Sequence, residues 1–289
     1  MESFDDPSFE LLRLPGKGVT LHARVTGPHD GPLAVLLHGF PETSDAWRRI
    51  APLLADAGLQ VLMPDQRGYG ASDKPRGAKA YGLDLLAEDI VLAARAMGRE
   101  RFSVVGHDWG GIVAWHLAAC KPDRVERAAI LNAPHPDVFR AHAMSHPTQL
   151  LRSGYVAFFQ VPVLPELALA AADFALLRNS MTASARPGAL DAALMERYRV
   201  AWAQPGALGA MLDWYRALPA SMAMKRPRVR VPVRVLWGDK DGFLDQGLAE
   251  ASLGCCEHGD VHHLHDATHW LHHEAPTDVA RLLVEWLRG

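Results

Sequence analysis

Short apolar runs alternate with helix-like stretches over much of this chain. Six runs are typical of buried strands because they are almost continuously apolar and end near Gly, Pro or polar residues. They are Leu33–Leu37, Leu59–Met63, Phe102–Gly106, Arg127–Leu131, Val233–Trp237 and Val261–Leu264. The stretches between them predict helices over Asp45–Ala57, Asp84–Met97, Gly111–Lys121 and Ala275–Leu287. Parallel strands covered by helices on both faces have this character, so the pattern predicts a doubly wound, mostly parallel α/β sheet. Phe9–Leu14 and Val19–Val25 are expected to form a hairpin at one edge.

The alternation is interrupted between residues 134 and 230. This stretch is rich in Ala, Leu and Met, contains several prolines and has no strand-like run. An all-helical insertion between two strands is expected to cover the carboxyl ends of the strands, where open α/β sheets bind ligands. We therefore predict a first core segment at 1–133, a helical cap at 134–230 and a second core segment at 231–289.

Composition narrows the class of protein. The chain has 289 residues, is 49% hydrophobic and carries a formal net charge of −3, so nothing global favours nucleic acid or an anionic membrane. The acidic N-terminus lacks the apolar region of a signal peptide, and prolines and acidic residues interrupt the apolar stretch Val161–Leu177. Three cysteines, two of them adjacent, do not suggest a disulfide framework. We expect a cytoplasmic protein, monomeric or homodimeric, without a membrane or nucleic-acid partner.

The segment Phe102–Gly111, FSVVGHDWGG, carries the main chemical signal. It has the strand–G-x-nucleophile-x-G–helix form of the nucleophile elbow of α/β-hydrolases, with Asp108 at the nucleophile position. Gly106 and Gly110 would leave room for the sharp turn. The alternative is an ordinary turn in which Asp108 caps the following helix.

Two backbone amides are expected beside Asp108. The sequence His38-Gly-Phe-Pro41 follows a predicted strand, at the position that supplies one oxyanion-hole donor in this fold. The Phe40 N–H would pair with the N–H of Trp109, the residue after the nucleophile. Pro41 is a candidate for a cis peptide bond because the chain must reverse tightly there.

An acid and a base follow the nucleophile in chain order. Asp241 comes after the strand Val233–Trp237 and is our candidate for the carboxylate that orients a histidine, with Asp239 and Asp245 as rivals. His269 follows the last strand, and the order nucleophile, acid, histidine is that of the α/β-hydrolase fold.

Seven of the fifteen histidines lie between His258 and His273, so a metal cluster is an alternative. The pair His273-Glu274 lacks the second histidine of an H-E-x-x-H zinc motif. We therefore expect no metal and no organic cofactor.

Three motifs together resemble the epoxide hydrolases of the α/β-hydrolase fold. They are His38–Glu42 (HGFPE), Pro64–Ser72 (PDQRGYGAS) and Gly106–Gly110 (GHDWG). The resemblance implies two cap tyrosines that hydrogen-bond the epoxide oxygen, and Tyr155 and Tyr215 stand in segments similar to the two tyrosine motifs of the family.

The resemblance implies a hydrolase that acts on the ether bond of a small apolar epoxide. The Asp108 carboxylate would open the ring and form an alkyl ester, while the phenols protonate the alkoxide. Water activated by His269 would then hydrolyse the ester. Candidate pocket residues are His38, Pro41, Phe139, Phe159 and Trp270, with Phe158, Leu164, Met181 and Met211 as further apolar candidates.

Other readings of the same residues remain open. Haloalkane and haloacid dehalogenases share the aspartate nucleophile, although the former typically have Asn where Phe40 stands and the latter usually have Arg where Trp109 stands. A non-catalytic ligand-binding protein is less expected because it would not need the full set of catalytic groups. A carboxylesterase is least expected because an aspartate that attacks an ester would form an anhydride.

Overall fold

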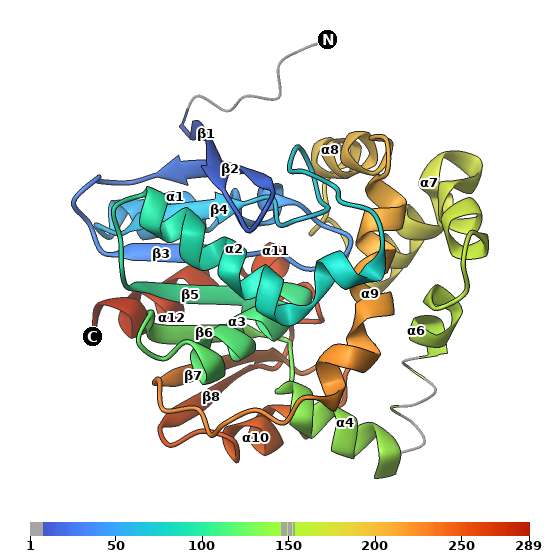
Figure 1. The fold of residues 1–289 in the computed structure, drawn as a ribbon. Coiled ribbons are helices and arrows are strands. Elements are labelled where there is room, and N and C mark those ends of the chain that lie inside the picture. Colours follow the sequence, from blue (N-terminus) through green and yellow to red (C-terminus); the bar gives the residue numbers. More distant parts are fainter. Residues whose placement is uncertain (1–7, 146–148, 150–151, 153) are drawn as a thin grey trace.

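The computed structural model describes residues 8–145, 149, 152 and 154–289. Its sheet is eight-stranded, in the order β1-β2-β4-β3-β5-β6-β7-β8 (Figure 1). The strands are β1 (Glu10–Pro15), β2 (Thr20–Thr26), β3 (Leu33–Leu37), β4 (Gln60–Pro64), β5 (Phe102–His107), β6 (Val125–Leu131), β7 (Val233–Gly238) and β8 (Gly259–Leu264). β1 and β2 form an antiparallel hairpin at one edge, β2 is antiparallel to β4, and the remaining pairings are parallel. The predicted hairpin and mostly parallel sheet are confirmed.

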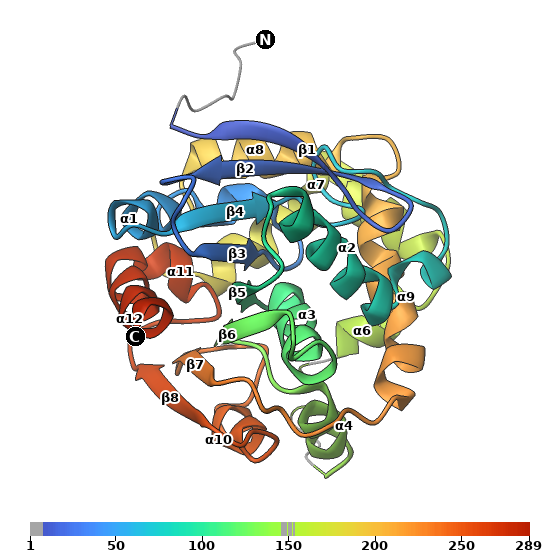
Figure 2. The same cartoon turned by 60° about the vertical axis from the view of Figure 1, so that its left-hand side comes forward.

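Helices cover both faces of the sheet. The helical elements outside the long insertion are η1 (Ser44–Trp47), α1 (Ala51–Asp56), η2 (Ala78–Tyr81), α2 (Leu83–Ala96), α3 (Trp109–Cys120), α10 (Leu248–Leu253), α11 (Leu271–Glu274) and α12 (Pro276–Arg288). Figure 2 shows α2 and α3 on one face and α1, α11 and α12 on the other. Strand β3 shows how the sequence produces this arrangement. Because side chains alternate along a strand, Val35 and Leu37 join the α2 and α3 core, whereas Ala34 and Leu36 join the α1 and α12 core.

Two predicted elements differ from the structure. The expected helix Asp45–Ala57 is divided into η1 and α1, with Pro52 in the first turn of α1. A proline inside one continuous helix would remove a hydrogen bond and clash with the preceding turn, whereas the first turn tolerates it. The predicted strand Val261–Leu264 was expected to be buried, but β8 lies at an edge of the sheet, where Gly259 is exposed and the other residues of the strand are only partly buried.

Between β6 and β7 the described residues form helices. We call this set the inserted helices: α4 (Pro136–Ser145), α6 (Gly154–Phe159), α7 (Leu164–Ser184), α8 (Ala192–Trp202) and α9 (Ala207–Ala223). Figure 1 shows α6 to α9 together beside one end of the sheet. The ring nitrogen of Trp202 donates to the carbonyl oxygen of Pro41 at 2.6 Å, and that of Trp214 donates to the carbonyl of Arg67 at 3.0 Å. The segment boundaries at 133/134 and 230/231 stay predictions.

None of the described helices is long and apolar enough to cross a bilayer. The first seven residues, part of the acidic N-terminus discussed above, lie outside the described residues.

Candidate active site

Asp108 stands at a sharp turn between β5 and α3. Its backbone has a φ of 50° and a ψ of −117°, a left-handed conformation that is unusual for a residue with a side chain. A Cβ at Gly106 would lie 2.2 Å from the carbonyl oxygen of Gly110, and a Cβ at Gly110 would lie 2.1 Å from the carbonyl oxygen of Leu37. Only glycine fits these two positions. The Asp108 side chain makes no capping hydrogen bond to α3, so the helix-capping alternative is wrong.

The Asp108 carboxylate lies between an amide and an imidazole. The Phe40 N–H donates to Oδ1 at 2.9 Å, and His269 Nε2 lies 3.7 Å from Oδ2. The Phe40–Pro41 peptide bond is cis, as the sequence suggested. Trp109 is the first residue of α3, where helical N–H groups lack a partner within the helix. The structure therefore places both predicted donor residues next to Asp108.

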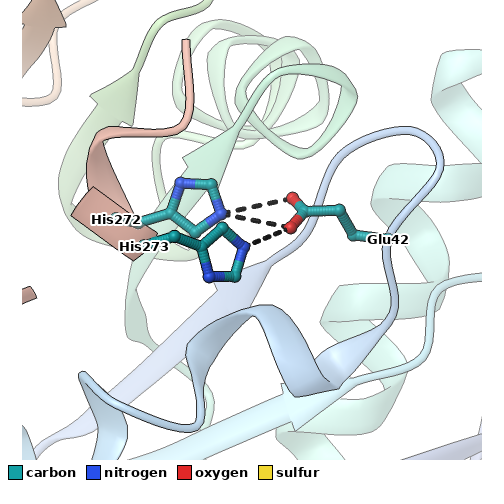
Figure 3. A group of neighbouring side chains, drawn as sticks. All are labelled: Glu42, His272 and His273. Atoms are coloured by element: carbon teal, nitrogen blue, oxygen red, sulfur yellow. Dashed lines mark hydrogen bonds and ion pairs between the residues drawn. The ribbon is translucent and has the colours of Figure 1, made fainter. Parts of the chain in front are cut away.

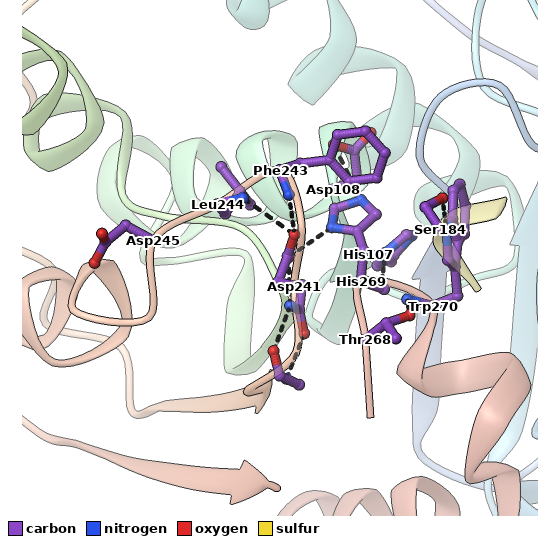
Figure 4. A network of polar contacts seen from close by, with 12 residues as sticks. His107, Asp108, Ser184, Asp241, Phe243, Leu244, Asp245, Thr268, His269 and Trp270 are labelled. Atoms are coloured by element: carbon purple, nitrogen blue, oxygen red, sulfur yellow. Dashed lines mark hydrogen bonds and ion pairs between the residues drawn. The ribbon is translucent and has the colours of Figure 1, made fainter. Parts of the chain in front are cut away.

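A second carboxylate holds the other side of the histidine ring. His269 Nδ1 lies 2.8 Å from Asp241 Oδ2, and Figure 4 shows His269 between Asp241 and Asp108. Asn132 Nδ2 donates to Asp241 Oδ2 at 2.6 Å, and the amides of Phe243 and Leu244 donate to Oδ1 at 2.7 and 3.1 Å. Four donors thus fix this carboxylate.

The rival aspartates point elsewhere. Asp239 bonds the rings of His263 and His265, and Asp245 accepts from the amide of Gly247 at 2.9 Å. Among the three candidates, the structure brings Asp241 to His269.

Neighbouring charges set the protonation of the histidine. Burial lowers the pKa of His269, but the carboxylates of Asp241 and Asp108 outweigh burial and raise that pKa to about 9. Burial raises the pKa of Asp241, but His269 and the bond from Asn132 outweigh it, so this pKa lies below its usual value. At neutral pH the site therefore holds an ionised Asp241 beside a protonated His269.

Tyr155 on α6 and Tyr215 on α9 face the same carboxylate from the inserted helices. Both line a cavity with Asp108, and their ring centroids are 5.9 Å apart. Tyr215 is 4% exposed, whereas Tyr155 is 38% exposed as a whole residue and packs its ring against Phe159. Burial and the Asp108 charge raise the pKa of both phenols. Both side chains therefore keep their protons at neutral pH and can donate them.

Two cavities meet at these residues. The larger has a volume of about 360 Å³ and the smaller about 70 Å³, and Asp108, Tyr155 and Tyr215 line both. Of the predicted pocket residues, Pro41, Phe158, Phe159, Met181 and Trp270 line the larger cavity, together with the oxyanion-hole candidate Phe40, and Phe139 lines the smaller, together with Trp109. These walls are mostly apolar, which suits an apolar ligand.

Three pocket predictions differ from the structure. Leu164 and Met211 line neither cavity, and neither does His38. The His38 ring is fully buried. Its Nε2 accepts from the amide of Gln66 at 3.0 Å, and its Nδ1 lies 3.0 Å from the carbonyl oxygen of Gly39. His38 therefore stabilises the loop that contains Phe40 through these two contacts.

Comparison with known proteins assigns the family. A family model described as alpha/beta hydrolase fold matches residues 32–276. The AB hydrolase superfamily protein YfhM of Bacillus subtilis is 44% identical over 94% of this chain and 96% of the relative. Epoxide hydrolase 4 of Homo sapiens is 34% identical over 98% of this chain and 80% of the relative. The chain belongs to the epoxide hydrolases of the α/β-hydrolase fold. It is therefore a hydrolase of the family whose members act on the ether bond of epoxides.

A solved structure agrees with this placement in the epoxide hydrolase family. It is described among novel epoxide hydrolases of the alpha/beta hydrolases superfamily in metagenomes from hot environments. The two structures share a TM-score of 0.87 and 33% identity over 97% of this chain and 99% of the other.

This epoxide hydrolase also has a buried polar cluster in which two of the histidines between His258 and His273 meet Glu42, a partner that the sequence pattern did not single out. Glu42 is fully buried and faces His272 and His273 of α11 (Figure 3). The potential ligand atoms of these three residues lie within 4.8 Å of one another, so this set is a candidate for holding a cation. Glu42 is the last residue of the HGFPE motif. A glutamate at this place in the motif was the sequence signal that could have indicated the cluster.

Proposed function

We propose that this enzyme hydrolyses epoxides to vicinal diols through an alkyl ester on Asp108. The observation that carries the proposal is the larger apolar cavity, which is lined by the Asp108 carboxylate, two protonated phenols and the His269 imidazole. An epoxide needs a nucleophile and a proton donor on opposite sides of the breaking C–O bond. Tyr155 and Tyr215 supply the donors, and Asp108 supplies the nucleophile.

The hydrogen bonds of Asp108 distinguish its two oxygens. Oδ1 accepts the Phe40 N–H, so Oδ2 is the freer nucleophile. Attack by Oδ2 on a ring carbon forms the ester bond, and the C–O electrons go to the epoxide oxygen. That oxygen takes a proton from a phenol. Oδ1 becomes the ester carbonyl oxygen and stays on the Phe40 amide.

The ester changes the charge beside His269. The Asp108 carboxylate is one of the groups that raise the pKa of His269, and esterification neutralises it. The imidazole pKa therefore falls, and the imidazolium proton can restore the phenol that protonated the epoxide oxygen. The neutral ring can then accept a proton from water as that water attacks the Asp108 carbonyl carbon. The oxyanion develops on Oδ1, where the Phe40 and Trp109 amides would stabilise it.

Collapse of this intermediate completes the proton balance. The Cγ–Oδ2 bond breaks, and the leaving oxygen takes the proton from His269. The carboxyl group formed on Asp108 loses the second water proton, which protonates His269 again and restores the starting state. Phe40, Trp109 and His269 thus serve the second half-reaction, whereas Tyr155 and Tyr215 serve the first.

Isotope labelling tests the ester directly. In a single turnover of styrene oxide in ¹⁸O-water, the label should appear in Asp108, and the oxygen added to the diol should come from the enzyme. Asp108→Ala should abolish diol formation, and His269→Gln should accumulate the ester as added mass on the Asp108 peptide. Label found only in the first-turnover diol would refute the ester mechanism. Halide release from chloroacetate without diol from styrene oxide would instead indicate a dehalogenase.

A further inference from the structure

A buried glutamine between two of the inserted helices bonds the loop that follows β7. Gln149 lies between α4 and α6 in the chain, and its side chain is fully buried. Its Nε2 donates to the carbonyl oxygen of Phe243 at 2.9 Å, and its Oε1 accepts the N–H of Asp245 at 2.9 Å. A side-chain amide can both donate and accept, so Gln149 bonds two backbone groups of this loop at once. Gln149 lines neither cavity, so it does not act by touching substrate.

One peptide group of this loop lies between Gln149 and the acid of the site. The N–H groups of Phe243 and Leu244 donate to Asp241 Oδ1 at 2.7 and 3.1 Å (Figure 4). The carbonyl oxygen of Phe243, which accepts the bond from Gln149, belongs to the same peptide group as the N–H of Leu244. Because a peptide group is planar, a bond that fixes its oxygen also fixes the direction of its N–H. Gln149 therefore directs the Leu244 amide towards Asp241.

The side chains of the same loop contact the base. The Phe243 ring makes a T-shaped contact with His269, with centroids 5.2 Å apart, and its centroid lies 6.4 Å from that of Tyr155. Phe243 lines the larger cavity, and Leu244 lines both. His269 Nδ1 also faces Asp241 Oδ2 at 2.8 Å. A shift of the loop would therefore move the carboxylate partner of His269 together with the ring that packs against it.

The two bonds of Gln149 restrain a segment that would otherwise be less ordered, because loops are more mobile than the strands they follow. A buried donor or acceptor that loses its partner costs free energy. Without the amide, the carbonyl oxygen of Phe243 and the N–H of Asp245 would turn towards other partners. A displacement of a catalytic group by ~1 Å can slow a reaction about 10²-fold. A small movement at Asp241 would therefore be enough to slow a step that depends on His269.

We propose that Gln149 is a positioning residue that aligns Asp241 and His269 for ester hydrolysis. It acts through the carbonyl group and the ring of Phe243 and does not touch the reacting atoms. Gln149 precedes α6, the helix of Tyr155, so one side chain connects the segment of a first-step proton donor to the loop of the base. The inference rests on the proposed function, specifically on its second half-reaction.

Gln149→Met tests this role, because methionine has nearly the length of glutamine but cannot make either bond. Ester decay in Gln149→Met should slow by about 10- to 100-fold, since His269 loses its alignment. Ester formation should stay within about threefold of wild type, because Asp108 Oδ2 is untouched and Tyr155 still packs against Tyr215. A residue that only stabilised the fold would not alter one half-reaction alone.

The assay follows styrene oxide by rapid quench and intact mass, with enzyme in excess, so that ester formation and ester decay are separate rates. Gln60→Met is a matched control, because Gln60 is also buried and its Oε1 accepts a bond from Arg99 at 3.5 Å. Gln60 lies on β4 and lines neither cavity. Both rates should be unchanged in this control.

Equal ester decay in Gln149→Met and wild type would overturn the inference, and so would equal slowing of both half-reactions. If Gln149→Met does not fold, Gln149→Asn takes its place, because its amide is one methylene too short to bond both Phe243 and Asp245. Slow ester decay with normal ester formation in this variant supports the inference, and unchanged decay overturns it. Failure of the proposed function is distinguishable, because the wild type would then form no ester at all.

Discussion

Removing the hydroxyl group of Tyr155 or Tyr215 should slow ester formation, and removing both should slow it further. Each phenol would donate a hydrogen bond to the developing alkoxide, and a bond to a charged group contributes about 1.5–3 kcal/mol. At ~1.4 kcal/mol per tenfold change in rate, Tyr155→Phe or Tyr215→Phe should slow ester formation about 10- to 150-fold. The double variant loses both donors and should slow it about 10²- to 10⁴-fold, the range of general-acid catalysis. Phenylalanine keeps the ring contacts of both tyrosines with Phe159, so packing should change little.

A rapid-quench assay at saturating styrene oxide measures this rate as ester formed on Asp108. Thermal unfolding of each variant serves as the control for packing, with less than about 1 kcal/mol of change expected for the loss of a hydroxyl that bonds substrate. Ester decay should be similar in all variants, since the phenols act before the ester exists. A double variant no slower than either single variant would refute the two-donor reasoning.

Three further predictions concern stability. The His269 pKa is raised from 6.5 to about 9 in the folded protein; the resulting stabilisation is fully present below about pH 6.5 and is lost as the pH rises towards 9. The difference in melting temperature between wild type and His269→Gln should therefore shrink from pH 6 to pH 9.5, and a constant difference would contradict this. Gly110→Ala should unfold the protein or lower its melting temperature sharply, because the new Cβ would lie 2.1 Å from a backbone oxygen. Gly209→Ala is its control: it has free space, lies inside α9 and should stabilise by up to about 1 kcal/mol. Trp202→Phe removes the buried bond to Pro41 and should lower the free energy of unfolding, measured in urea, by about 1–3 kcal/mol.

The sheet was predictable because its central strands are buried on both faces. Every residue of β3, β4, β5 and β7 is buried, so each strand appears in the sequence as an apolar run. The elbow was predictable for a similar reason, since only glycine fits at two fixed spacings from Asp108. The edge strand β8 is not buried on both faces. Its apolar run in the sequence therefore led to an overestimate of its burial.

Asp241 was the predicted acid and meets His269, but the sequence alone could not exclude its neighbours. Asp239 and Asp245 are only two and four residues away, and the loop decides which carboxylate meets His269. Asn132, which directly follows β6, donates a hydrogen bond to Asp241. A contact between residues so far apart in the sequence leaves no local sequence pattern. The contacts of His272 and His273 with Glu42 were hidden for the same reason, because Glu42 lies far away in the sequence.

The bonds between the inserted helices and the sheet bear on how substrate reaches Asp108. Trp202 and Tyr198 anchor α8 to the Pro41–Glu42 loop, and Trp214 anchors α9 to Arg67 through another buried bond. Lifting α8 and α9 together would break all three bonds at once. Substrate and diol that pass beside α6 and α7 would leave these three hydrogen bonds intact. There Leu176 lines the cavity and is 52% exposed, and Tyr155 lies at the same rim. Substitutions at Leu176 should therefore alter the rates of substrate entry and diol exit while both chemical steps stay unchanged.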